Sequence, residues 1–224
     1  MARLHRAIVG GGHACTPEEL LAAFQTVTAD FDSPARESFE DSGPPGRWAA
    51  LARELGISDG LIPFEVVERT YEDITLNPPP VAMPYVHTAV EAMKQKGYRL
   101  GVICNTGMAG GRVLRDVLRH HGLFDLFDVT VFSNEFGYAK PHPKIFVHTL
   151  AELGGVPASQ ALHVGDMEQL DVEGARRAGL FSALYAPEAE ADGENLRTNA
   201  DFVVRDWRRF ASQVARFNHD VMPG

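Results

Sequence analysis

The chain has 224 residues, which suffices for one α/β domain with a smaller insertion. Its formal net charge of −9 argues against nucleic acid and anionic membranes as partners, because both require a basic face, and no apolar run approaches the ~18–20 residues of a membrane span. The two cysteines, Cys15 and Cys104, are far apart and not in metal-ligand spacing, so we expect no disulfide framework and a cytoplasmic location.

The first eighty residues have helical patterns. Thr16, Pro17 and Glu19 predict a helix start, with Thr16 as N-cap, Pro17 at the first helical position and Glu19 completing a capping box. The other expected elements are a loop over residues 34–46 and helices over residues 47–55 and about 63–74. Three prolines, at 78–80, end this block. We therefore predict a small helical cap over residues 1–80.

From residue 81 onward, apolar runs alternate with helical patterns. Five runs are typical of strands, over residues 98–104, 129–133, 161–165, 181–185 and 201–204. The helices expected between them cover residues 86–96, 111–121, 145–153 and 172–178. Strands separated by helices imply right-handed crossovers and a mostly parallel sheet. The predicted fold class is therefore α/β, with the core domain over residues 81–224.

Polar residues follow three of the predicted strands, at the edge where parallel sheets bind ligands. They are Cys104, Asn105 and Thr106 after the first strand, Lys140 beyond the second, and Asp166 and Asp171 after the third. Each has an ordinary alternative, such as a surface lysine, a turn aspartate or a core cysteine. Together they suit phosphoryl transfer, because a lysine offsets phosphate charge, one carboxylate holds a hard cation and the other fixes the lysine.

Three segments resemble motifs two, three and four of the haloacid dehalogenase (HAD) superfamily. They read VICNTG over residues 102–107, GYAKPHPKIF over 137–146 and HVGDMEQLDVEGARRAG over 163–179. The preceding helices resemble the type-one cap of the phosphoglycolate-phosphatase-like branch. The resemblance implies a Rossmann-like core and a Mg²⁺-dependent hydrolase of small phosphomonoesters.

The resemblance also implies roles for single residues. Cys104 takes the place of the usual Ser/Thr donor to the phosphoryl oxygen, Lys140 stabilises the transferring charge, and Asp171 orients Lys140. Asp166 binds Mg²⁺, which favours the phosphatases over the haloacid dehalogenases. The implied substrate-binding residues are Cys104, Asn105, Thr106 and Lys140.

The nucleophile motif of that family, apolar-apolar-apolar-Asp-x-Asp-Gly-Thr, has no match in this sequence. The run at residues 7–9 leads into three glycines, and Asp30-Phe31-Asp32 follows a helical pattern. We expect residues 3–9 to be the tail of a cap helix and the chain to start inside the cap, through a start-site error, a truncation or a genuine loss. The first core strand is then absent, which leaves neighbouring strands with unpaired backbone groups and the covalent step without a nucleophile.

The sequence thus predicts a HAD-like phosphatase that is inactive as written. The alternatives are a non-catalytic HAD-like protein for phosphate binding or assembly, and a haloacid dehalogenase. The expected partner is a small phosphorylated metabolite, and the expected state is a monomer or homodimer.

Overall fold

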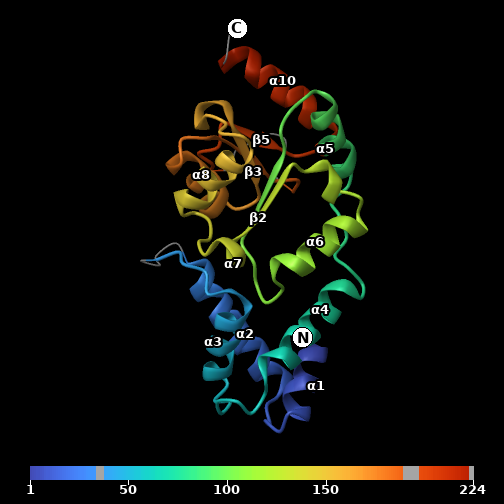
Figure 1. The fold of residues 1–224 in the computed structure, drawn as a ribbon, viewed down its shortest axis with the longest axis vertical. Coiled ribbons are helices and arrows are strands. Elements are labelled where there is room, and N and C mark those ends of the chain that lie inside the picture. The colour runs from blue at the N-terminus through green and yellow to red at the C-terminus, as the bar shows by residue number, and fades with distance from the viewer. Residues whose placement is uncertain (34–37, 189–196, 222–224) are drawn as a thin grey trace. The chain divides into compact units, whose positions relative to one another are not determined.

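The structure, a computed structural model, describes residues 1–33, 38–188 and 197–221 (Figure 1). Its helices are α1 Ala2–Gly10, α2 Pro17–Asp32, α3 Gly43–Glu54, α4 Phe64–Leu76, α5 Val86–Gln95, α6 Gly111–His120, α7 Ser133–Phe136, α8 Pro143–Glu152, α9 Glu173–Arg177 and α10 Phe210–Val221. Its strands are β1 Gly101–Cys104, β2 Val129–Phe132, β3 Leu162–Gly165, β4 Phe181–Tyr185 and β5 Phe202–Val204. Within the described residues, no helix is both long and apolar enough to cross a membrane.

The chain forms two compact units. The first comprises residues 1–80, 104–120 and 131–139, and the second comprises residues 81–103, 121–130 and 140–224. The assignment of residues 1–80 to a cap and 81–224 to a core stays a prediction.

The N-terminal helices of the first unit form where local signals predict them. Thr16 Oγ1 accepts a hydrogen bond from Glu19 N at 3.1 Å, and Glu19 Oε2 accepts one from Thr16 N at 2.7 Å, so the predicted capping box is confirmed. The segment predicted as a helix tail is helix α1, and residues 30–32 end helix α2. Neither candidate for a nucleophile strand is therefore a strand.

Helix α3 begins earlier than predicted, at Gly43 rather than at residue 47. Gly43 has φ +66°, and its N–H donates to Asp41 Oδ1 at 2.8 Å. Pro44 and Pro45 follow in the first turn, where the helix has no use for their missing N–H groups. The expected loop is therefore shorter, and its residues 34–37 lie outside the described residues.

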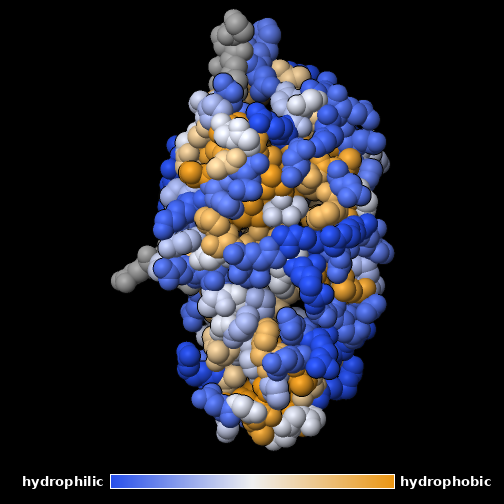
Figure 2. Space-filling view, in the orientation of Figure 1, coloured by the Kyte–Doolittle hydropathy of each residue, from blue (hydrophilic) through white to orange (hydrophobic). Residues whose placement is uncertain are grey.

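The core of the first unit is built from one apolar face of each helix. Leu4, Ile8, Leu20, Leu51 and Val67, from α1 to α4, are completely buried. Burial of an aliphatic side chain of this size contributes roughly 1.5–3 kcal/mol. Figure 2 shows apolar surface where α1 lies, at the lower end of the view.

The described strands form two sheets. In the first, β1 and β2 are neighbours; in the second the order is β3-β4-β5, with both pairs parallel. In the second sheet His163 is opposite Ser182, and Leu184 is opposite Val203. The prediction of an α/β fold with parallel strands is confirmed. Among the described residues before β1, the only strand-like contact is the isolated bridge between Glu40 and Tyr138, so no strand precedes β1.

Helices α5 and α10 pack with the second sheet around one apolar cluster. Met93 of α5, Ala183 of β4, Val204 of β5 and Val214 of α10 are buried in it. This packing holds the strands of the second sheet in place, and with them the carboxyl end of β3, where the predicted lysine–carboxylate group lies.

Candidate functional site

The end of β3 carries a buried carboxylate. The chain leaves β3 at Gly165, bends at Asp166 and enters a single π-helical turn, Glu168–Val172, which brings Asp171 back against the strand end. A Cβ atom added at Gly165 would lie 2.1 Å from Asp171 Cγ, so only glycine allows this approach. Asp171 is 3% exposed.

Three donors surround the Asp171 carboxylate. Oδ1 accepts a hydrogen bond from Lys140 Nζ at 2.6 Å and lies 2.8 Å from His163 Nε2, while Oδ2 accepts one from Met167 N at 3.0 Å. The Lys140 side chain is 12% exposed. The structure therefore brings together Lys140 and Asp171, as the family pattern suggests, while their roles in phosphoryl transfer stay predictions.

The charges in this cluster follow from burial and from the neighbouring groups. Burial alone raises the pKa of Asp171, but the hydrogen bond from His163 and the charge of Lys140 outweigh it and hold the pKa well below its usual range. Burial lowers the pKa of His163, and the Lys140 charge lowers it further, against a smaller opposing effect of Asp171. At neutral pH the cluster is therefore one ammonium, one carboxylate and one neutral imidazole.

Asp166, the predicted metal ligand, is exposed in the bend after β3. Two nearby carboxylates have other partners: Asp171 binds Lys140, and Glu168 accepts hydrogen bonds from Thr198 Oγ1 at 2.6 Å and Asn199 N at 2.7 Å. The described part of the chain contains no group of three or more His, Cys, Asp or Glu side chains that could hold a metal ion. Asp166 alone fits Mg²⁺ only as one ligand of an ion that takes its others mainly from water and phosphoryl oxygens.

In the first unit, the loop after β1 is held by side chains from two other segments. Thr106 N donates to Ser133 Oγ at 2.8 Å, and Thr106 Oγ1 donates to Asp41 Oδ2 at 3.3 Å. Ser133 Oγ also donates to Asp41 Oδ2. Asp41, Thr106 and Ser133 are all buried. The Thr106 hydroxyl therefore fixes this loop, and direct binding of substrate by Thr106 stays a prediction.

The predicted donor Cys104 makes a local contact. Its Sγ donates to the carbonyl of Asn105 at 3.4 Å, and the thiol is partly buried. Cys104, Asn105 and Thr106 belong to the first unit, whereas Lys140, Asp166 and Asp171 belong to the second.

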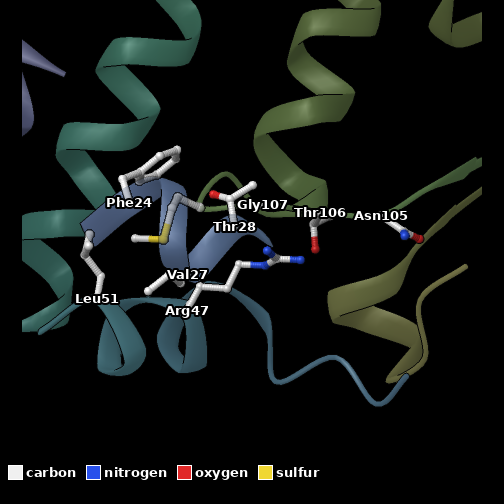
Figure 3. Close-up of a pocket in the computed structure, with 9 residues that line it drawn as sticks. Phe24, Val27, Thr28, Arg47, Leu51, Asn105, Thr106 and Gly107 are labelled. Atoms are coloured by element: carbon white, nitrogen blue, oxygen red, sulfur yellow. The ribbon is translucent and has the colours of Figure 1, made fainter. Parts of the chain in front are cut away.

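A cavity of about 170 Å³ opens beside the loop after β1 (Figure 3). Arg47, which is 6% exposed, points into it toward Thr106, and its guanidinium carbon lies 4.3 Å from the centre of the Phe31 ring. The lining residues are Phe24, Val27, Thr28, Arg47, Leu51, Asn105, Thr106, Gly107 and Met108. The cavity thus combines an apolar wall with one buried cation.

Sequence reasoning assigned no role in the site to several residues around Asp171 and around the loop after β1. His163 and Gly165 are two residues apart on a strand and share a face, which is a signal that could have connected His163 with the site. Ser133 is the last residue of the predicted strand over residues 129–133 and directly follows β2 in the structure, so the strand-end rule could have connected it with the site. Asp41 and Arg47 carry no such signal.

Comparison with known proteins decides the family. The family profile described as haloacid dehalogenase-like hydrolase matches residues 16–179. The chain belongs to this family. The match contains all six predicted site residues and most of the residues that hold them in both units.

Two curated relatives illustrate the range of this HAD-like family. Haloacid dehalogenase-like hydrolase domain-containing protein 3 from Bos taurus is 29% identical over 133 residues, covering 59% of this chain and 51% of that protein. Phosphoglycolate phosphatase from Aquifex aeolicus is 36% identical over 122 residues, covering 54% of this chain and 55% of that protein. The chain therefore spans about half the length of the curated relatives it matches.

A solved structure with the same fold is the HAD-hydrolase YfnB from Bacillus subtilis, described as bound to magnesium. It superimposes with a TM-score of 0.62 at 18% identity and covers 98% of this chain and 90% of that chain. At this identity the likeness shows the HAD fold alone.

Proposed function

We propose that this HAD-like chain carries the phosphate-binding and lysine–carboxylate part of a Mg²⁺-dependent phosphatase of small phosphomonoesters. The observation that carries the proposal is the buried pair of Lys140 and Asp171, joined at 2.6 Å beside the end of β3. A cation held in place by a buried carboxylate suits a transferring phosphoryl group, whose charge grows on its outer oxygens. The phosphatase names of relatives such as the Aquifex aeolicus protein support the same substrate class.

The residues of the chain have separate tasks in this proposal. Lys140 binds a phosphoryl oxygen through its ammonium group, whose position is fixed by the hydrogen bond to Asp171. Cys104 and Asn105 contribute donors to the remaining oxygens, and Thr106 holds their loop through Asp41. Asp166 is the proposed Mg²⁺ ligand, and bound Mg²⁺ would neutralise part of the phosphoryl charge.

The covalent step needs a nucleophile that the printed sequence does not contain. No Asp-x-Asp-Gly-Thr segment occurs in the 224 residues, and the two nearest candidates are parts of helices α1 and α2. We therefore propose that the chain as printed binds phosphate without turnover, and that a form with the nucleophile strand is the active phosphatase.

The proposal is tested by assaying p-nitrophenyl phosphate with Mg²⁺ and, separately, by titrating inorganic phosphate into the chain. We expect phosphate binding, and hydrolysis no faster than that of the Asp166→Ala variant. Mg²⁺-dependent hydrolysis that Asp166→Ala abolishes would contradict the missing-nucleophile proposal. Absence of phosphate binding would contradict the phosphate-site proposal itself.

Two alternatives are separated by further measurements. A non-catalytic phosphate-binding or assembly protein is favoured if the codons upstream of Met1 contain an in-frame stop while protein of this length accumulates in cells. An open frame that encodes Asp-x-Asp-Gly-Thr favours the phosphatase. A haloacid dehalogenase is favoured if a chain extended by that frame releases chloride from a 2-chloroacid without requiring Mg²⁺.

A further inference from the structure

The imidazole of His163 belongs to the lysine–carboxylate cluster, although the family resemblance assigned this residue no role. It lies on β3, and its side chain is 11% exposed. Nε2 is 2.8 Å from Asp171 Oδ1, the same oxygen that accepts the hydrogen bond from Lys140 Nζ. Two side chains from different segments therefore converge on a single carboxylate oxygen.

The ring of His163 is held in its plane by an aromatic contact. The ring of Phe146, which is completely buried in α8, meets the imidazole edge to face, with centroids 5.1 Å apart and planes at 86°. Edge-to-face geometry of this kind is the preferred arrangement of aromatic pairs. The imidazole therefore points Nε2 at Asp171 with little freedom to rotate.

The chemistry of the pair determines which ring nitrogen carries the proton. An ionised carboxylate can only accept hydrogen bonds, so the proton between Nε2 and Oδ1 belongs to Nε2. A neutral imidazole has one N–H, so Nδ1 is unprotonated. An imidazole of His163 protonated on both nitrogens would be a second cation beside Lys140 and would compete with the ammonium for Asp171. The neutral imidazole with its proton on Nε2 donates to Asp171 without adding a charge.

We infer that His163 is a positioning residue: its Nε2–H fixes the Asp171 carboxylate so that Oδ1 holds the Lys140 ammonium in the orientation that binds a phosphoryl oxygen. Without this donor, Asp171 keeps Met167 N on Oδ2 but can rotate about that contact, and the direction of the Lys140 ammonium changes with it. The inference rests on the proposed function in one respect only, namely that the group bound by Lys140 is a phosphoryl group.

The tautomer is tested first, in the unmodified 224-residue chain. Nitrogen-15 spectra at pH 7, assigned by the loss of one signal set in His163→Gln, are expected to show a protonated Nε2 and an unprotonated Nδ1 for His163. A proton on Nδ1, or on both nitrogens, would overturn the inference.

The positioning role is tested with two substitutions and a control. His163→Leu removes the donor, His163→Gln returns an N–H to a similar place, and His87→Leu changes an exposed histidine of α5. For folded protein we expect the dissociation constant of inorganic phosphate to rise roughly tenfold in His163→Leu, the effect of one hydrogen bond to a charged group, and to change less than about twofold in the other two. Equal affinity in all variants would overturn the inference.

A further measurement separates this inference from the proposed function. The nitrogen-15 signal of the Lys140 ammonium is observable when a hydrogen bond slows its proton exchange, and no phosphate is needed. We expect the signal in the unmodified chain and in His163→Gln, and its loss in His163→Leu. If the unmodified chain binds no phosphate, the proposed function fails and the Lys140 signal alone decides the role of His163.

Discussion

Lys140 and Asp171 lie 31 residues apart in the chain, yet their side chains are joined by a hydrogen bond of 2.6 Å that is largely shielded from water. Burial of two charges is costly unless each finds its partner. The pair is consequently both a stabilising contact that must stay complete and the proposed phosphate-binding element.

Removal of the carboxylate charge is expected to destabilise the chain. In Asp171→Asn the buried Lys140 loses its counter-charge, and we expect a loss of about 3 kcal/mol in the free energy of unfolding at pH 7. The matched control is Asp73→Asn, which breaks the exposed 2.8 Å pair with Arg3 and should cost less than about 1 kcal/mol. Urea unfolding measures both, and equal losses would contradict the special importance of the buried pair.

The stability of the chain should depend on pH through His163. Its folded pKa lies below the ordinary value of 6.5, so the unfolded state binds a proton that the folded state does not. The contribution of His163 to the free energy of unfolding is complete above pH 6.5 and is lost as pH falls toward the folded pKa. The free energy of unfolding then changes by at most about 1.4 kcal/mol per pH unit. Urea unfolding between pH 7 and roughly pH 4.5 measures this slope.

The control for this pH dependence is His163→Gln, which cannot titrate. His142, whose pKa burial and the Lys144 charge also lower, contributes in the same range to both proteins, so the difference between the two curves isolates His163. Asp171 affects the free energy of unfolding only at lower pH. Because its folded pKa is lowered, its contribution to stability is lost only as pH falls below about 3.8. Parallel curves for the two proteins would contradict the prediction.

Phosphate binding should depend on Lys140 and not on lysine charge in general. Lys140→Met removes the buried ammonium, and we expect at least roughly tenfold weaker binding of inorganic phosphate, the value of one charge-assisted hydrogen bond. Lys144→Met removes an exposed ammonium four residues away and should leave the dissociation constant within about twofold. Isothermal titration measures both, and a similar effect of the two substitutions would indicate only a general electrostatic attraction.

The loop after β1 should loosen when Asp41 loses an acceptor. In Asp41→Asn an amide N–H₂ replaces one carboxylate oxygen, and it meets either the two hydroxyls of Thr106 and Ser133 or the N–H of Gly43. In the first orientation the two hydroxyls lose the oxygen to which they donate, and in the second Gly43 N loses its acceptor; a buried donor without an acceptor costs about 1–3 kcal/mol. The control is Asp59→Asn, at an exposed position. Its free energy of unfolding in urea should be within about 0.5 kcal/mol of that of the unmodified chain.

Much of the local structure is readable from the sequence, because its causes lie within a few residues. The start of α2 follows from Thr16 and Glu19, which bond each other's backbone three residues apart. The strand β4 occupies the predicted residues, and the other strands are within a few residues of the prediction. The predicted start of α3 at residue 47 was wrong, because Gly43 N and the Asp41 side chain form a hydrogen bond that composition does not reveal.

The sequence by itself determined the α/β fold, the family and the residues that follow each strand, since these depend on periodicity and on motifs of contiguous residues. Only the tertiary structure decided which side chains meet. Asp41 contacts Thr106 across 65 residues and Ser133 across 92, and His163 shares an oxygen of Asp171 with Lys140. Such contacts depend on how the chain returns on itself, through the π-helical turn after Asp166 and the packing of α8 beside β3, and no local pattern encodes that path.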